Sequence, residues 1–334
     1  MKAIIQREYG IPSQVLQLRE LETPTPKAGE VLVRVKATTV AGDDWHLMRG
    51  LPYFARTATG LRRPSSPIPG QDLAGIIEAV GEGVIEFAPG DEVFGWNGGT
   101  FAEFVTVPVG NLLRKPERLS FEEAASVPVV AFTALQGLRD KGGIKPGHEV
   151  LIIGASGGVG TMAVQIAKAH GASVTGVAGA RNAQLVLDLG ADRVIDYRRE
   201  DYLAGENRYD IILDLVGDRP TRALRRALTE EGTLVMVGSS KYSAAGNEPR
   251  GLERLFMGTV DRWLTGALGA VLSKQSVRPL IHQDSQDDLA ILSAMIEAGE
   301  LKPVVDRTFR LHEAAEALRY QDESRAPGRV VVAP

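Results

Sequence analysis

A chain of 334 residues is too long for one compact core and predicts two domains. Hydrophobic residues make up 44% of the sequence and charged residues 24%, as in ordinary globular proteins, and a net charge of −4 argues against a nucleic-acid partner. The absence of cysteine excludes disulfides, thiolate catalysis and thiolate-bound zinc.

The N-terminus lacks the apolar stretch of a secretory signal, and the longest apolar segment, 263–272, is far shorter than a membrane span. We therefore expect a cytoplasmic protein with no membrane partner.

The first third of the chain predicts a β-rich domain. Short β-branched or alternating apolar runs occupy 2–6, 30–37, 73–80 and 101–107 and are separated by Pro and Gly turns. This pattern is typical of a barrel-like or partly open β domain. The segment 50–69 is expected to be a surface loop. Its basic residues either are solvated or steer an anionic ligand; they are Arg56, Arg62 and Arg63.

From residue 121 onward, the pattern changes to alternating helices and strands. A helical stretch at 121–140 precedes strands at 150–153, 173–177, 193–195, 211–215 and 233–237, with helices at 162–170, 184–189 and 221–228 between them. This alternation predicts an α/β fold with a doubly wound parallel sheet. The last part of the chain predicts helices at 286–299 and 311–320 and a closing strand at 329–332.

The run 150–160 reads as a strand, a tight glycine turn and the start of a helix. The second strand, 173–177, follows at the spacing that a βαβ unit needs. Such a turn lets a pyrophosphate approach the backbone and the helix start. The glycines at 154, 157 and 160 depart from the usual G-x-G-x-x-G pattern, so plain strand-to-helix packing is the alternative. The predicted nucleotide-binding residues are Ser156, Gly157, Gly158, Val159 and Gly160.

Further motifs extend over the whole chain. They are GQDLAG at 70–75, VGEGV at 80–84, PGDEVFG at 89–95, FTAL at 132–135, LGAD at 189–192 and PGRVV at 327–331. Together with the glycine turn, they resemble the medium-chain dehydrogenase/reductase superfamily and, within it, the zinc-free quinone oxidoreductase branch. The resemblance implies a GroES-like catalytic domain at 1–122, a Rossmann NADP-binding domain at 123–270 and a C-terminal return to the first domain at 271–334. It also implies a homodimer and a cofactor cleft between the domains.

Zinc-dependent relatives hold their catalytic metal at positions that match Ala41, Gln71 and Val129 here. Alanine and valine offer no donor atom, and a glutamine amide is a poor zinc ligand. We therefore expect no metal. Without a Lewis acid to acidify an alcohol, hydride transfer to an already polarised quinone or enone is the favoured chemistry.

The expected cofactor is NADPH. NAD-binding Rossmann units carry an acid at the end of the second strand, and 177–182 contains none. Arg181 is placed to meet a 2′-phosphate, although an exposed cation near a helix start is the alternative. By resemblance, Tyr197 lies beside the same phosphate; otherwise it covers a loop.

The resemblance implies two catalytic candidates. Tyr53 can donate a hydrogen bond or a proton to a developing enolate, or else it packs a loop. His46 serves as a proton relay or ribose contact, or else as a hydrogen-bonded structural residue. Ala41 departs from the asparagine of many quinone reductases, which puts a direct transfer of quinone specificity in doubt.

Several other residues are implied to bind the cofactor. Thr133 meets the nicotinamide carboxamide or bonds back to its own helix. Arg329 reaches the cofactor or is an exposed charge on a strand edge. The remaining cofactor candidates end later strands; they are Val216, Gly238 and Ser239. Trp96 and Phe256 line the acceptor pocket or pack in a core or an interface, and Asn97 is a turn candidate.

These observations predict a zinc-independent, NADPH-dependent reductase that acts on a small conjugated carbonyl compound or quinone. Two alternatives stay open. One is an enoyl-thioester (CoA or ACP) reductase, for which the basic loop would accept a phosphorylated carrier. The other is a low-turnover NADPH-binding redox sensor.

Overall fold

The computed structural model describes residues 1–41, 44–237, 273–324 and 326–334, which form two compact units. Unit 1 comprises Met1–Val129, Asp284–Glu297 and Pro303–Pro334. Unit 2 comprises Val130–Gln283 and Ala298–Lys302. The boundary between the two units therefore falls inside one helix, α5 (Pro128–Gln136).

Some predicted features lie outside the described residues. They are the cofactor candidates Gly238 and Ser239, the pocket candidate Phe256 and the apolar segment 263–272. The backbone of His46 is described as part of helix α2 (Asp44–Met48), but its side chain is not. Among the described helices, none has the length and apolar character needed to cross a bilayer.

A seven-stranded sheet forms the centre of unit 1. Its main order is β14-β15-β3-β4-β5-β7, and β6 pairs with β3; a separate two-stranded sheet joins β1 and β2. The strands are β1 (Lys2–Gln6), β2 (Leu16–Glu20), β3 (Glu30–Val40), β4 (Asp72–Val80), β5 (Glu92–Trp96), β6 (Phe104–Pro108), β7 (Leu112–Arg114), β14 (Val305–Arg310) and β15 (Arg329–Ala333).

Alternation of apolar side chains along β3 explains how this sheet builds its core. Val31, Val33 and Val35 are buried and pack with apolar residues of β4, β5, β6 and β7. The predicted β-rich domain is confirmed. Strands β5, β7 and β14 were not predicted, because glycine interrupts β5, β7 is only three residues long and charged residues dominate β14.

The C-terminal strand β15 joins the sheet of the N-terminal segment. It pairs antiparallel with β3, for example Val331 with Thr39, and parallel with β14. Helix α12 contributes Ala317 and Leu318 to the same core as Val330. The described helices of unit 1 are α1 (Pro12–Val15), α2, α3 (Arg56–Thr59), α4 (Phe121–Ala125), α11 (Gln286–Glu297) and α12 (Ala314–Ser324), with short 3-10 turns at Tyr53–Ala55, Val109–Asn111 and Leu311–Glu313.

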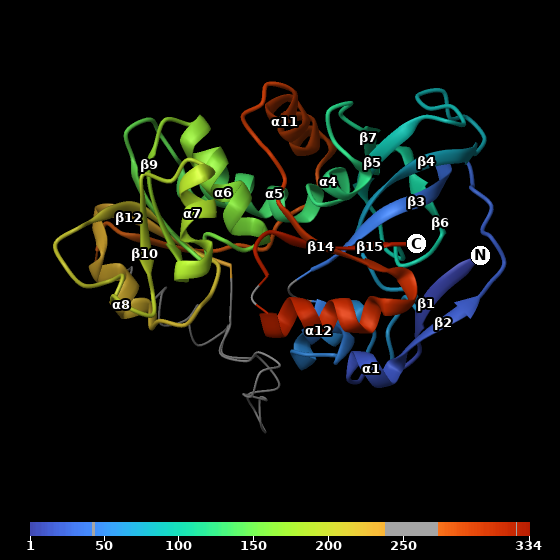
Figure 1. Cartoon of the computed structure of the whole chain (residues 1–334), viewed down its shortest axis with the longest axis horizontal. Helices are drawn as coiled ribbons and strands as arrows, with labels where there is room; N and C mark the ends of the chain where they lie inside the picture. The colour runs from blue at the N-terminus through green and yellow to red at the C-terminus, as the bar shows by residue number, and fades with distance from the viewer. Residues whose placement is uncertain (42–43, 238–272, 325) are drawn as a thin grey trace. The chain divides into compact units, whose positions relative to one another are not determined.

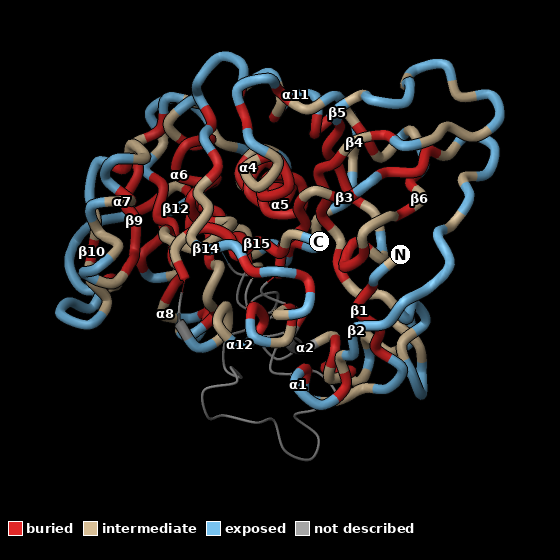
Figure 2. The backbone as a smooth tube through the Cα atoms, turned by 45° about the vertical axis from the view of Figure 1, so that its right-hand side comes forward, coloured by how far each residue is buried: buried red, intermediate tan, exposed pale blue. Residues whose placement is uncertain are grey.

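Unit 2 is built on six parallel strands in the order β10-β9-β8-β11-β12-β13. This confirms the predicted doubly wound sheet. The strands are β8 (Glu149–Ile153), β9 (Ser173–Ala178), β10 (Arg193–Asp196), β11 (Tyr209–Asp214), β12 (Leu228–Met236) and β13 (Ser276–Pro279). The first four residues after Glu149 are apolar and fully or almost fully buried, as expected for a central parallel strand. The neighbouring strand β9 is buried along most of its length (Figure 2).

Helices cover the sheet of unit 2 (Figure 1). Helix α6 (Gly158–Ala169) packs on β8 and β9, α7 (Ala183–Asp188) packs on β9 and β10, and α8 (Thr221–Arg226) packs on β12. A π-helical turn (Gly137–Gly142) follows α5, and a 3-10 turn (Ala180–Asn182) precedes α7. The strand order reverses at β8, so β8 and β11 form the point where ligands bind in open parallel sheets.

Candidate functional site

The glycine turn after β8 is tightly packed in unit 2. Gly154 has a φ of +91°, a conformation that glycine adopts without steric cost. A Cβ atom on Gly160 would overlap the carbonyl oxygen of Gly154, and one on Gly154 would lie 2.9 Å from Val216. The turn and the loop after β11 therefore lie side by side, and a side chain at 154 would separate them, whereas one at 160 would push the helix start away from the turn.

Helix α6 begins with unsatisfied backbone donors at this turn. Its N-cap is Gly157, which has no side chain to accept from the first-turn N–H groups. The helix runs for 12 residues, so its dipole reinforces the positive character of those groups. This end of α6 fits an anionic diphosphate, which is what the sequence predicted for 156–160.

The loops after β8 and β9 meet beside the start of α6. The amide of Asn182 donates to the Ser156 hydroxyl at 3.4 Å, a long hydrogen bond. Arg181, in the same turn as Asn182, is exposed to solvent. The ring of Tyr197, just beyond β10, lies within 3.6 Å of where a Cβ on Gly179 would stand. The predicted residues therefore gather at the carboxyl ends of three adjacent strands.

A buried carboxylate organises the loop after β11. Asp214 is fully buried, and its Oδ1 accepts from the N–H of Gly217 at 2.8 Å and from that of Val216 at 3.2 Å. The sequence analysis selected Val216 but missed Asp214, whose position at the end of an apolar strand was the available signal. Thr133 is buried on α5 in the same unit.

A tyrosine that the sequence analysis overlooked supports the neighbouring loop. The Tyr202 hydroxyl donates to Asp218 at 2.7 Å, and the Arg219 guanidinium lies 5.1 Å from the ring centre. Burial raises the pKa of the Tyr202 phenol, and the bond to Asp218 raises it further. This phenol therefore stays protonated and links the segment after β10 to the loop after β11.

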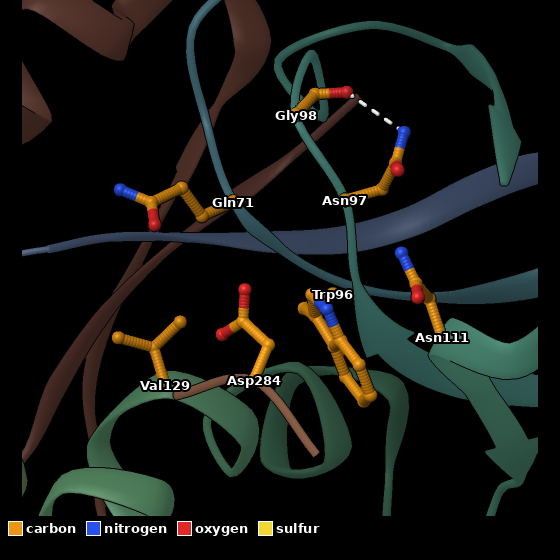
Figure 3. A pocket seen from close by; sticks show the side chains of 7 residues that line it. All are labelled: Gln71, Trp96, Asn97, Gly98, Asn111, Val129 and Asp284. Carbon is orange, nitrogen blue, oxygen red and sulfur yellow. Dashed lines mark hydrogen bonds between the residues drawn. The ribbon is translucent and has the colours of Figure 1, made fainter. Parts of the chain in front are cut away.

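Unit 1 contains a pocket of about 260 Å³ (Figure 3). Most of its lining side chains carry amide, carboxylate or indole groups; the residues are Gln71, Trp96, Asn97, Gly98, Asn111, Val129 and Asp284. Trp96, which the sequence analysis assigned either to the acceptor pocket or to packing, lines this pocket and is largely buried. Asn111 and Asp284 were missed, because neither belongs to a motif and only tertiary packing brings them into one pocket with Gln71.

Two of the three positions that the sequence analysis matched to zinc ligands lie on this pocket, Gln71 and Val129. The third, Ala41, is buried, and its N–H donates to the buried carboxylate of Asp44 at 2.7 Å. Within the described ranges, no three His, Asp or Glu residues gather closely enough to hold a metal ion.

A buried ion pair supports the back of the pocket. Asp72, next to Gln71, accepts from the Val129 N–H at 3.0 Å, from the Thr39 hydroxyl at 2.6 Å and from Arg329 at 2.5 Å. The Arg329 side chain is 5% exposed, so the alternative of an exposed strand-edge charge is wrong. The sequence analysis offered an exposed strand edge because it did not predict β14, which covers the outer side of β15.

The predicted catalytic residue Tyr53 lies in a clamp of two tyrosines and one arginine. The Arg56 guanidinium is 4.5 Å from the ring centre of Tyr53 and 4.5 Å from that of Tyr9, within cation–π distance. Its Nε donates to the Gly50 carbonyl at 2.8 Å. The interpretation of Arg56 as a solvated charge is therefore wrong, whereas Arg62 and Arg63 are exposed as expected.

Comparison with known families gives two matches. Residues 27–117 match the family described as alcohol dehydrogenase GroES-like domain, and residues 189–332 match the family described as zinc-binding dehydrogenase. The chain is 32% identical to human quinone oxidoreductase over 328 residues, which cover 95% of this chain and 92% of the human protein.

Solved structures share the fold over the whole chain. A NAD-dependent alcohol dehydrogenase superimposes with a TM-score of 0.82 at 30% identity and full coverage of both chains. The CurK enoyl reductase superimposes with a TM-score of 0.80 at 28% identity, covering 99% of this chain and 98% of its own. The names of these similar proteins give three different reactions on one architecture, so the acceptor has to be argued from this chain's own residues.

Proposed function

This chain belongs to the medium-chain dehydrogenase/reductase superfamily, in its quinone oxidoreductase-like branch, and we propose that it is a zinc-independent reductase that transfers hydride from NADPH to a quinone or an α,β-unsaturated carbonyl compound. The sequence-based assignment to this superfamily is confirmed, and with it a nicotinamide-dependent oxidoreductase. NADPH, zinc independence and the class of acceptor are the steps that we add.

The start of α6 carries the proposal. Its first-turn N–H groups, uncapped by Gly157, would hold the diphosphate, and bound NADPH would supply the hydride. Ser156, Val159 and Val216 would flank the diphosphate and the adjoining ribose. Thr133 is proposed to orient the carboxamide, and Arg329 is retained as a weaker candidate because its guanidinium already binds Asp72.

The preference for NADPH rests on charge. No acid stands between the end of β9 and Arg181, and the exposed guanidinium would bind a 2′-phosphate. Tyr197 would cover the same phosphate from the next loop. We expect Arg181→Ala to lower kcat/KM for NADPH at least tenfold while changing that for NADH little.

Arg193→Ala is the matched control, because this arginine is also exposed but begins β10. If the natural enzyme prefers NADH and the Arg181→Ala variant keeps that preference, the assignment of NADPH is overturned.

In unit 1, the polar pocket is proposed to receive the acceptor. Its amides would orient the carbonyl, and Tyr53 or His46, or water, would deliver the proton to the developing enolate. Gln71 and Val129 leave the metal positions without good ligands, so turnover should survive EDTA unchanged. Loss of turnover on chelation, with stoichiometric zinc in the purified protein, would refute zinc independence.

We further propose that the protein is a homodimer, and light scattering would test this oligomeric state.

A second candidate is an enoyl-thioester reductase, favoured by the similarity to the CurK enoyl reductase. Arg56 is engaged between two tyrosines, so only the exposed Arg62 and Arg63 are left to attract a phosphorylated carrier. Much higher kcat/KM for a CoA enoyl thioester than for its free enone would favour this candidate. Binding of NADPH without steady oxidation across all acceptors would instead indicate a redox sensor.

A further inference from the structure

The loop after β11 is anchored at both of its ends. At its start, the buried Asp214 carboxylate accepts from the N–H groups of Val216 and Gly217, at 3.2 and 2.8 Å. At its far end, the Asp218 carboxylate accepts from the Tyr202 hydroxyl at 2.7 Å. The short segment between these two anchors therefore has little freedom to move.

Arg219 ties the same loop to the segment after β10. Its Nη2 donates to the Asp201 carboxylate at 3.2 Å, and its guanidinium lies 5.1 Å from the centre of the Tyr202 ring. A guanidinium and an aromatic ring attract each other at this distance. These contacts define the Tyr202 cluster, which consists of Asp201, Tyr202, Asp218 and Arg219. The cluster therefore joins two segments that follow different strands of one sheet.

The ring of Tyr202 fixes this cluster to the core of unit 2. Tyr202 is 3% exposed and belongs to one apolar cluster with Tyr209 and Leu224. Val216 packs against the same apolar residues, and its side chain would lie 2.9 Å from a Cβ on Gly154. The core thus supports, through Tyr202, a loop that borders the glycine turn.

The place of this loop in the sheet indicates which part of a dinucleotide it would meet. A doubly wound sheet has two mononucleotide-binding halves and binds a dinucleotide across the switch point between them. Strands β8, β9 and β10 form the half that would hold the adenosine, because Arg181 follows β9. Strand β11 begins the other half, so the loop after it would meet the nicotinamide half.

We propose that the Tyr202 cluster positions NADPH, because it holds the loop after β11 where Val216 contacts the nicotinamide half. Tyr202, Asp218 and Arg219 are then positioning residues, which act through Val216. A released loop adopts the binding conformation in only a fraction of the molecules, and the apparent Kd rises in proportion. This inference rests on the proposed function, because it assigns positioning residues for the cofactor of that reaction.

The experiment compares two ligands of the Tyr202→Phe variant of the full chain. Adenosine 2′,5′-bisphosphate contains only the adenosine half, whereas NADPH contains both halves. The phenyl ring keeps the core contacts, and the Asp218 side chain is 44% exposed and can bind water instead of the hydroxyl, so the variant should fold. In calorimetry, we expect the Kd for NADPH to rise roughly fivefold and that for the bisphosphate to stay within about twofold.

Tyr320→Phe is the matched control in unit 1. The Tyr320 hydroxyl donates to Asp306 at 2.9 Å, and the Arg307 guanidinium lies 4.5 Å from the ring centre. This variant loses the same kind of bond and should leave both Kd values unchanged. Asp218→Asn keeps an acceptor for the Tyr202 hydroxyl and should retain most of the affinity for NADPH, whereas Asp218→Ala should resemble Tyr202→Phe.

Equal weakening of the two ligands in Tyr202→Phe, or a lower melting temperature with unchanged Kd values, would overturn the inference. If the natural chain binds NADPH but oxidises none with a panel of quinones and enones, the proposed function fails, and the two Kd values still decide the role of the Tyr202 cluster. Steady oxidation with an unchanged ratio of Kd values gives the opposite result. If the natural chain binds NADH instead, NADH and adenosine 5′-monophosphate replace the two ligands; if it binds neither dinucleotide, both proposals fail.

Discussion

Removal of the buried carboxylate of Asp72 tests the ion pair behind the pocket. The Asp72 side chain is 1% exposed and that of its partner Arg329 is 5% exposed. Asp72→Ala removes the bonds to Arg329, to the Thr39 hydroxyl and to the Val129 N–H. It leaves a guanidinium buried, and the Nε of that group has no hydrogen-bond partner even in the natural chain.

Loss of one partner of a buried ion pair costs about 3–5 kcal/mol. The same sheet contains a matched exposed pair, in which Arg34 of β3 binds Glu78 of β4 and the two side chains are 47% and 40% exposed. Loss of a pair so exposed costs about 0.2–1 kcal/mol. The free energy of unfolding should therefore fall by roughly 3 kcal/mol more in Asp72→Ala than in Glu78→Ala.

Urea denaturation followed by circular dichroism and tryptophan fluorescence measures this difference from the shift in midpoint and the slope. A double variant, Asp72→Leu with Arg329→Met, should lose less than the sum of the two single variants, because no uncompensated charge remains buried. If Asp72→Ala loses no more stability than Glu78→Ala, or if the double variant is simply additive, the buried pair does not support the sheet as argued.

Three further outcomes are expected. Gly160→Ala should weaken dinucleotide binding at least tenfold in calorimetry, because the added Cβ overlaps the carbonyl of Gly154; unchanged affinity would contradict the close packing of the turn. Arg56→Ala should lower kcat more than it raises KM, and it should add little to Tyr53→Phe, because the arginine acts by positioning that ring; additive losses in the double variant would argue against this. The hydrogen bond that Lys168 donates to Asp192 lowers the pKa of this carboxyl group, so the carboxylate is favoured in the folded state. Its contribution, on the order of 1 kcal/mol, should be present at neutral pH and disappear as the pH falls below about 3.9. Asp192→Asn should therefore be less stable than the natural chain at pH 7 and nearly equal at pH 3; a difference unchanged by pH would refute the assignment.

The sequence by itself determined the parts of this protein whose signals are local. The run from β8 through α6 to β9 was predicted from adjacent residues, because an apolar strand, a glycine turn and an amphipathic helix each have a short period. The same reasoning placed Ser156 to Gly160 at the helix start, where the structure has an uncapped N-terminus. Motifs spread along the chain were enough to indicate the superfamily.

Only the tertiary structure decided which charged and polar residues are buried, and against what. Arg329 and Asp72 are 257 residues apart in the chain and meet inside one sheet. From the sequence, Arg56 resembled the solvated cations Arg62 and Arg63, but its guanidinium lies 4.5 Å from the ring centres of both Tyr9 and Tyr53. Asp284 joins the pocket from a segment without any motif. The physical reason is that the sequence specifies the chemistry of each side chain, whereas the desolvation of that side chain and its hydrogen-bond and ion-pair partners depend on distant segments that only folding brings together.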